Sequence, residues 1–141
     1  MEKRYVKVLL KLSNKANRSN EVPVAAIIVY HNKIIGKGYN QREKNNLTIS
    51  HAEIEAINQA NKWMGDWRLN NCTMYVTMKP CDMCEKVIKE ARIDRVYYLV
   101  ERDVHKHQYN KTEFVKSSRQ DSDEYVVKYK EKLAQFWKNK R

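Results

Sequence analysis

The chain of 141 residues has few of the residues that interrupt regular structure, with 3 glycines and 2 prolines. Their scarcity predicts short loops, because glycine and proline are typical of turns. No run of about 18 apolar residues is present, which excludes a helix long enough to span a membrane. The N-terminal segment carries scattered charges and no cleavable apolar stretch, so we expect no secretory signal and a cytoplasmic protein. The length predicts one domain over residues 1–141.

Cysteine is also scarce, and acidic residues are outnumbered. The chain has 3 cysteines, two of which, Cys81 and Cys84, form a CxxC motif. In a chain without a secretory signal, this pattern favours a metal or redox site over a disulfide framework. Lysine and arginine number 28 against 17 aspartates and glutamates, which gives a net charge of +11. This charge suggests an anionic partner, with nucleic acid first, although a lysine-rich composition is also typical of A/T-rich genomes.

Hydrophobic periodicity predicts helices that alternate with strands. The first helix is expected near the N-terminus, where Tyr5, Val8, Leu9, Leu12 and Ala16 form one apolar stripe. Because strands that alternate with helices pack in layers, we expect a three-layer α/β/α domain. The expected strands are Val24–Tyr30, Lys33–Tyr39, Thr73–Met78 and Arg95–Val100, and the further helices are His51–Met64, Asp82–Ala91 and Glu124–Trp137, the last within a basic segment at about 123–139.

Two short motifs, His51-Ala52-Glu53 and Pro80-Cys81-Asp82-Met83-Cys84, carry residues that bind zinc. Each is expected at the first turn of a helix, where free N–H groups and the helix dipole stabilise a thiolate. A catalytic zinc takes three protein ligands and leaves a fourth position for water. Since the CxxC spacing lets both sulfurs reach one ion, the sequence predicts a zinc ion held by His51, Cys81 and Cys84.

Glu53 lies two residues after the histidine ligand, within reach of a water at the metal. A carboxylate there can accept a proton from water and deliver it to a ring nitrogen and then to leaving ammonia. Both motifs together match the H-x-E…P-C-x-x-C signature of zinc deaminases, whereas either motif alone is weak. Ser50 is expected to cap the following helix, with Glu53 completing a capping box. Cys72 has no ligand spacing and is predicted to be a buried structural residue.

Over about residues 1 to 100 the sequence resembles the bacterial tRNA adenosine deaminases of the TadA type, in the cytidine and deoxycytidylate deaminase superfamily. Its EVPV segment begins 30 positions before HAE, and HAE begins 30 positions before the first cysteine of PCxMC, an order that is more specific than the zinc motifs alone. The matching segments outside the zinc motifs are Glu21-Val22-Pro23-Val24-Ala25-Ala26, Asn40, Trp67-Arg68-Leu69, Tyr75-Val76-Thr77, Arg92-Ile93-Asp94-Arg95-Val96 and the terminal Phe136-Trp137-Lys138.

The resemblance implies a cytidine-deaminase-like fold with a mixed sheet, and deamination of adenosine to inosine at anticodon wobble position 34, with tRNA-Arg as the expected substrate. In that reaction a zinc-bound hydroxide attacks C6, Glu53 carries protons, and ammonia leaves. Asn40 and the backbone N–H of Ala52 are expected to bind the flipped base, while Val24 and Pro80 line the pocket. The resemblance also implies one Zn²⁺ per subunit and a homodimer that binds the anticodon stem-loop.

The sequence departs from the family pattern at three places. Lys79 stands where family members usually carry glutamate, and Glu85 and Lys86 stand where small residues usually follow the second cysteine. Charged side chains at these two positions could alter helix packing or the subunit contact, and the sequence does not tell which. Residues 101–109 replace a loop of small residues, so the family's substrate contacts in that loop are not carried over to this chain.

Alternative interpretations remain open for the function and for single residues. A deaminase of free guanine or of a cytosine compound has the same zinc motifs, and a non-catalytic, zinc-stabilised RNA-binding subunit would not need Glu53. Asn40 follows a strand, where asparagine commonly forms a turn. His105 and His107 are expected to be solvated loop residues, and contact with RNA phosphate is the alternative. The lysines of the terminal helix either contact RNA phosphates or form a solvated face.

Overall fold

The computed structural model describes residues 1–102 and 111–140, and His105 and His107 lie outside them. The chain divides into two compact units, residues 1–104 and residues 105–141. One domain over the whole chain stays a prediction. Within the described residues, no helix is both long and apolar enough to cross a membrane.

The first unit is built on a four-stranded sheet with the strand order β2-β1-β3-β4. Strand β1 (Ala25–Tyr30) is antiparallel to both of its neighbours, β2 (Lys33–Tyr39) and β3 (Cys72–Met78). Strand β4 (Arg95–Val100) pairs parallel with β3. The sheet is therefore mixed, as the resemblance implies, and the strand bounds lie within one residue of those expected from the sequence.

Local sequence explains how these strands are connected. His31 and Asn32 form the two-residue turn between β1 and β2, with φ values of 47° and 64°. Positive φ at both turn residues matches the right-handed twist of a hairpin. The parallel pair β3–β4 needs a longer crossover, which α4 (Asp82–Glu90) supplies.

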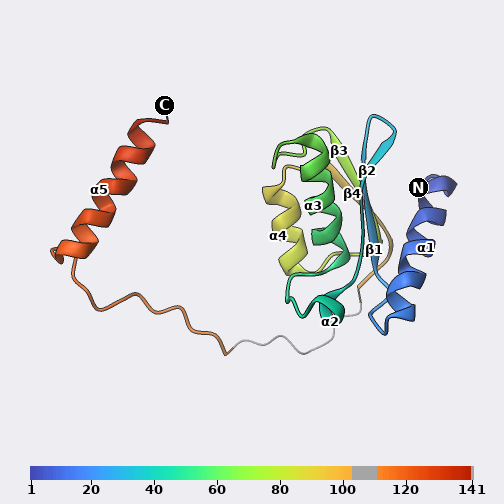
Figure 1. The fold of residues 1–141 in the computed structure, drawn as a ribbon, viewed down its shortest axis with the longest axis horizontal. Coiled ribbons are helices and arrows are strands. Elements are labelled where there is room, and N and C mark those ends of the chain that lie inside the picture. The colour runs from blue at the N-terminus through green and yellow to red at the C-terminus, as the bar shows by residue number, and fades with distance from the viewer. Residues whose placement is uncertain (103–110, 141) are drawn as a thin grey trace. The chain divides into compact units, whose positions relative to one another are not determined.

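Helices cover both faces of the sheet (Figure 1). Helix α1 (Lys3–Arg18) lies on one face, and α3 (Ala52–Met64) lies with α4 on the other. The three-layer prediction is therefore confirmed. The buried side of α1 contains four residues of the predicted stripe and packs on β1, and Val8 is partly buried beside it. The core on this side consists of Tyr5, Leu9, Leu12, Ala25, Ile27 and Val29.

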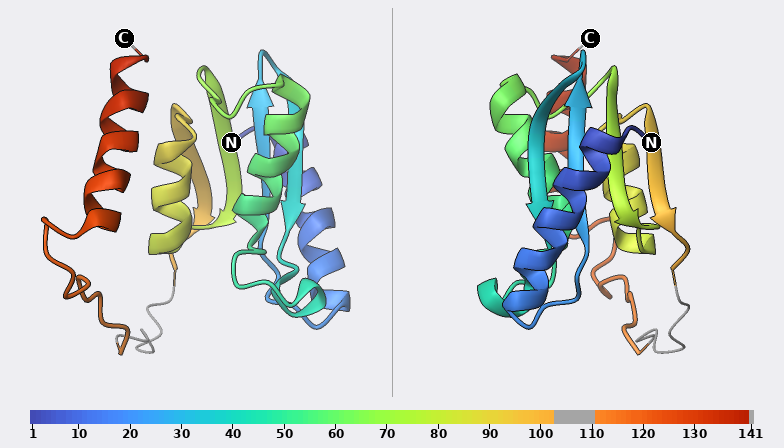
Figure 2. Two further views of the ribbon diagram at one scale, coloured as in Figure 1. Left: turned by 60° about the vertical axis from the view of Figure 1, so that its left-hand side comes forward. Right: turned by 90° about the vertical axis from the view of Figure 1, so that its right-hand side faces the viewer.

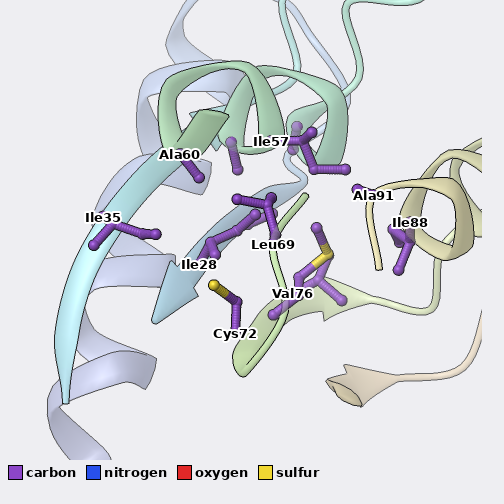
Figure 3. Packing of buried hydrophobic residues seen from close by; sticks show 13 residues of the cluster. Ile28, Ile35, Ile57, Ala60, Leu69, Cys72, Val76, Ile88 and Ala91 are labelled. Carbon is purple, nitrogen blue, oxygen red and sulfur yellow. The ribbon is translucent and has the colours of Figure 1, made fainter. Parts of the chain in front are cut away.

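The larger core lies between the sheet and the helices α3 and α4 (Figure 3). Ile57 from α3, Ile88 from α4 and Leu69 from the loop before β3 meet strand residues such as Val76 there. Cys72 belongs to this core with no exposed surface, which agrees with its prediction as a small buried residue. This core fixes α3 and α4 relative to the sheet, and both helices begin at residues of the candidate site.

The capping box predicted for α3 is wrong. His51 is the N-cap residue, and no side chain forms a capping hydrogen bond there. Ser50 is buried and engaged elsewhere: its hydroxyl accepts a hydrogen bond from Asn45 Nδ2 at 3.3 Å, and its carbonyl accepts one from the Gln41 N–H at 2.9 Å. The preceding loop therefore takes the polar groups of Ser50 away from the helix terminus.

The second unit contains α5 (Glu124–Lys138). Asp123 caps this helix, because its side chain accepts a hydrogen bond from the Tyr125 N–H at 2.9 Å. The predicted helix at about 123–139 therefore agrees with the structure once its caps, Asp123 and Asn139, are included.

Candidate active site

The predicted zinc ligands come together where two helices begin at one edge of the sheet. His51 and Cys81 are the N-cap residues of α3 and α4, and Cys84 lies in the first turn of α4. His51 Nδ1 lies 3.6 Å from Cys81 Sγ and 3.5 Å from Cys84 Sγ. All three ligand atoms lie within 4.8 Å of one another.

These distances fit a tetrahedral zinc ion. With Zn–S bonds of about 2.3 Å and a Zn–N bond of about 2.0 Å, a tetrahedral angle separates the nitrogen from each sulfur by about 3.5 Å. The two nitrogen–sulfur distances, 3.5 and 3.6 Å, have this value. Cys84 is buried, while His51 and Cys81 are half-buried, so the group is reachable from solvent on one side. Three protein ligands with an accessible side are the arrangement of a catalytic rather than a closed structural site.

The two thiols have opposite proton affinities. The pKa of Cys81 is lowered to about 3, mainly because the Cys84 side chain hydrogen-bonds to its thiolate, with burial opposing and His51 assisting. The pKa of Cys84 is raised by the same hydrogen bond and by its burial beside Glu53. A divalent cation would therefore bind Cys81 as a thiolate without displacing a proton, whereas it would have to displace the proton of Cys84.

Glu53 has a buried carboxyl group, one oxygen of which forms no hydrogen bond with the described residues. It is 3% exposed, and burial raises the pKa of its carboxyl group. Its Oε1 atom has no hydrogen-bond partner among the described residues. A buried carboxylate oxygen without a partner is destabilising, and such atoms need a specific explanation. Catalysis offers one, since this oxygen is available to a water or a substrate at the His/Cys/Cys group.

Two glycines of β2 set the position of α3 and hence of His51 and Glu53. A Cβ atom at Gly38 would lie 2.2 Å from the Ala52 carbonyl oxygen, and one at Gly36 would lie 2.3 Å from the Ala56 carbonyl oxygen. Only glycine permits so close an approach of the helix backbone to the strand. The first turn of α3 therefore rests directly on β2.

Glu21 supports the segment that leads to the candidate site, a role that the sequence does not indicate. It is 5% exposed, and its Oε1 accepts hydrogen bonds from the N–H groups of Glu43 at 2.7 Å and Lys44 at 2.9 Å. These donors belong to the short helix α2 (Arg42–Asn45), which leads through residues 46–50 to His51. The position of Glu21 in the EVPV segment was the sequence signal available for it. Its role could not be read from neighbouring residues, because its hydrogen-bond partners lie 22 and 23 residues further along the chain.

The predicted substrate residues lie in the segments that border this edge. The Asn40 N–H donates to the Val24 carbonyl at 3.1 Å, and Asn40 Oδ1 accepts from the Arg42 N–H at 3.3 Å, which is the turn that asparagine commonly forms. Ala52 is the first residue of α3, where a backbone N–H has no partner within the helix. Pro80 directly precedes Cys81. Their roles toward a substrate stay predictions.

Glu85 and Lys86 do not disturb the packing of α4. Both side chains are exposed, and Glu85 Oε1 forms an ion pair with Lys89 Nζ at 3.3 Å, one helical turn away. They therefore lie on the solvent side of α4 and leave the core unaffected. Lys79 is likewise exposed, and its N–H donates to the Val100 carbonyl at 3.0 Å.

Comparison with known proteins agrees with this geometry. The family model described as the cytidine and deoxycytidylate deaminase zinc-binding region matches residues 1–100. A tRNA-specific adenosine deaminase of Streptococcus pyogenes serotype M18 is 44% identical over 94 residues, covering 67% of this chain and 59% of that protein. The chain thus matches less than two thirds of the length of this relative. A tRNA-specific adenosine deaminase of Buchnera aphidicola subsp. Schizaphis graminum is 34% identical, covering 97% of this chain and 94% of that protein.

Solved structures show the same architecture. A structure from a study of A-to-I editing by tRNA:A34 deaminases at the wobble position has a TM-score of 0.69 and 33% identity, covering 70% of this chain and 76% of that chain. The guanine deaminase of Bacillus subtilis has a TM-score of 0.77, covering 99% of this chain and 95% of that chain. At 24% identity, this second likeness shows the fold alone.

Proposed function

The chain belongs to the cytidine and deoxycytidylate deaminase family, and we propose that it is a zinc-dependent enzyme that deaminates adenosine to inosine in a tRNA anticodon. The proposal extends to wobble position 34, with tRNA-Arg as the expected substrate. It is supported by the tRNA-specific adenosine deaminases that match 67–97% of the chain at 34–44% identity. It is also supported by the net charge of +11, which suits an RNA substrate.

His51, Cys81 and Cys84 would hold one zinc ion per subunit. When bound, zinc supplies the Lewis acidity that lowers the pKa of a water molecule to near neutrality. The donor set of one imidazole and two thiolates suits zinc, and the 3.5 and 3.6 Å separations of its atoms support this assignment.

Glu53 would move the protons of the reaction. The overall change consumes water and adenosine and yields inosine and ammonia. Both protons of the water are therefore transferred: one goes to N1, which keeps it in inosine, and the other goes to the departing amine, which leaves as ammonia. The unpartnered Oε1 of Glu53 is the one observation that carries this role. Burial raises its proton affinity, which suits a group that accepts a proton and then returns it.

The neighbouring segments would orient the base. Asn40 Oδ1 is engaged by the Arg42 N–H, which leaves the Asn40 Nδ2 group as the donor toward a base. The Ala52 N–H would donate to the base edge, and Val24 and Pro80 would line the pocket. An adenosine in an anticodon loop is already unpaired, so its extrusion costs little.

The remaining predictions concern the state of the protein in the cell. We infer a homodimer, a cytoplasmic location and contact between the basic terminal helix and RNA phosphates. The lysines of that helix support this last point, since α5 carries Lys128, Lys130, Lys132 and Lys138.

Replacing Glu53 tests the proposed chemistry. The zinc-loaded full chain is incubated with tRNA-Arg transcripts, and inosine at position 34 is measured by sequencing. Glu53→Gln should lower turnover by at least about 100-fold, the lower range for a general acid or base. Zinc content should stay at that of the wild type, because Glu53 is not a ligand.

Glu55→Gln provides the matched control, because Glu55 is half-buried on the same helix two residues away. It should retain turnover within a few-fold. Wild-type turnover in the Glu53→Gln variant would refute the proton shuttle. Inosine formation absent from tRNA, together with ammonia release from guanine or cytidine, would refute the RNA substrate.

A further inference from the structure

Helix α1 carries a row of basic side chains on the side that faces away from the sheet. Lysines recur at every fourth position and an arginine follows, and all of these side chains are exposed. The helix contains no aspartate or glutamate between Lys3 and Arg18. We name this row the basic ridge, and it consists of Lys3, Lys7, Lys11, Lys15 and Arg18.

The basic ridge is electrostatically unbalanced. Like charges four residues apart on a helix repel each other, and Lys3, Lys7, Lys11 and Lys15 form three such pairs in succession. Among the described residues, no carboxylate forms an ion pair with any member of the ridge. The nearby acidic residue Glu2 pairs instead with Arg4, at 2.8 Å. An external anion would therefore relieve a repulsion that the protein itself does not compensate.

The ridge begins at the sheet edge that holds the candidate site. Helix α1 ends at Arg18, and Glu21 then binds the backbone of α2, which leads to His51. From there the helix α1 runs along the sheet face opposite α3 and α4 (Figures 1 and 2), with the ridge on its outer side. With a helix rise of 1.5 Å per residue, Lys3 and Lys15 are about 18 Å apart, and successive lysines are about 6 Å apart along the axis.

We propose that the basic ridge of α1 binds the sugar-phosphate backbone of RNA beyond the nucleotide in the active site. The proposal rests on the proposed function, since an RNA anchored at the site would extend from the edge where the ridge begins. A line of regularly spaced point charges suits successive phosphates, and lysine binds phosphate as a point charge. The contact would add affinity without reading base sequence.

The form of α1 favours RNA over an anionic membrane surface. A helix that lies on a membrane needs an apolar face to insert beside its basic face. The apolar side of α1 is already buried against β1, through residues such as Tyr5, Leu9 and Leu12. Leu10 is the large hydrophobic residue of the helix that stays exposed, at 51%. One leucine beside five cations suits binding by charge alone.

The test measures binding of the zinc-loaded full chain to tRNA across a series of salt concentrations. The ridge variant is Lys7→Gln, Lys11→Gln and Lys15→Gln combined, and it should weaken binding at least about 10-fold at physiological salt. Its slope of log affinity against log salt should fall by about 2 to 3, since each lost phosphate contact removes about 0.7–0.9. With the anticodon stem-loop as substrate, KM should rise while kcat stays unchanged, because the ridge lies outside the site.

The control combines Lys37→Gln, Lys62→Gln and Lys89→Gln, which removes the same charge from β2, α3 and α4. It should bind tRNA within a few-fold of the wild type. Thermal unfolding checks the fold of both variants, and glutamine and lysine have nearly equal helix propensities.

Three results would overturn the ridge as an RNA site. The first is an equal loss of tRNA affinity in the ridge and control variants, and the second is absence of RNA binding by the wild-type chain. The third is a ridge variant that binds tRNA normally but no longer binds phosphatidylserine vesicles. The proposed function fails separately, through absence of inosine in wild-type reactions. Ridge-dependent RNA binding without inosine would keep this inference and reject the enzyme.

Discussion

Gly38→Ala tests whether the contact between β2 and α3 positions the candidate site. A Cβ atom at this position would lie 2.2 Å from the Ala52 carbonyl oxygen, 2.6 Å from the Ala56 backbone nitrogen and 2.8 Å from Glu55 Cβ. Two of these atoms belong to the helix backbone, so no side-chain rotation removes the overlap. The first turn of α3 must move away from the strand by roughly 1 Å to restore a normal contact.

This displacement acts on both His51 and Glu53. Overpacking of this kind costs about 1–3 kcal/mol of folding free energy. Metal ligands tolerate errors of only about 0.2 Å, and a misplacement of about 1 Å lowers catalytic rates by about 100-fold. We therefore expect Gly38→Ala to lose zinc affinity and turnover together, beyond the effect of its lower stability.

Zinc affinity is measured by competition with a chelator, and stability by urea unfolding of the zinc-loaded chain. Gly65→Ala is the control, because Gly65 ends α3 with a φ of 68° and open space around it. Alanine in that left-handed conformation costs about 1–2 kcal/mol without touching the site. If Gly38→Ala bound zinc as tightly as Gly65→Ala at comparable stability, the positioning role of Gly38 would be refuted.

Three further changes test single side chains. Asn40→Asp keeps the oxygen that accepts a hydrogen bond from the Arg42 N–H but removes the amide donor. If Asn40 binds the base, kcat/KM for tRNA should fall at least about 10-fold, and if it only forms a turn, kcat/KM should stay unchanged. Glu21→Ala leaves the N–H groups of Glu43 and Lys44 without their acceptor, which should lower the free energy of urea unfolding by about 1–3 kcal/mol. Glu21→Gln keeps one acceptor oxygen and should lower this free energy by less, and equal decreases for the two variants would contradict the explanation. Zinc binding should release about one proton near neutral pH, because the lowered pKa of Cys81 makes it a thiolate whereas the raised pKa of Cys84 keeps it protonated. Zinc affinity should therefore fall as pH falls. Calorimetry in buffers of different ionisation enthalpy measures the number of protons released, and a value of zero would contradict a protonated Cys84.

Local patterns in the sequence were sufficient for the four strands, for the helices other than the short α2, and for the choice of candidate zinc ligands. The stripe on α1 has the helical period, the continuous apolar run of β1 is that of a strand buried on both faces, and the predicted bounds of β2 and β4 agree with the structure to the residue. Two ligands lie in one CxxC motif, and the third lies beside Glu53. These features depend on neighbours in the chain, which is why periodicity and spacing were enough to find them.

Local reasoning failed where a segment outside the predicted element takes the hydrogen bonds of a group. Ser50 has the residue type and spacing of a helix cap, yet Asn45 and Gln41 take its hydrogen bonds. Glu21 looks like a surface carboxylate until the fold brings α2 onto it. Neither outcome follows from helix propensity or residue spacing, because each depends on side-chain hydrogen bonds that form only in the folded chain.

The sequence by itself therefore determined which residues are candidates for binding zinc and moving protons, and which segments, α2 apart, form helices and strands. Only the tertiary structure decided that His51 Nδ1 lies 3.6 and 3.5 Å from the two cysteine sulfurs, and that Glu53 Oε1 has no hydrogen-bond partner among the described residues. The reason is physical: residue type and periodicity are properties of the chain, whereas burial and convergence depend on packing between segments far apart in it.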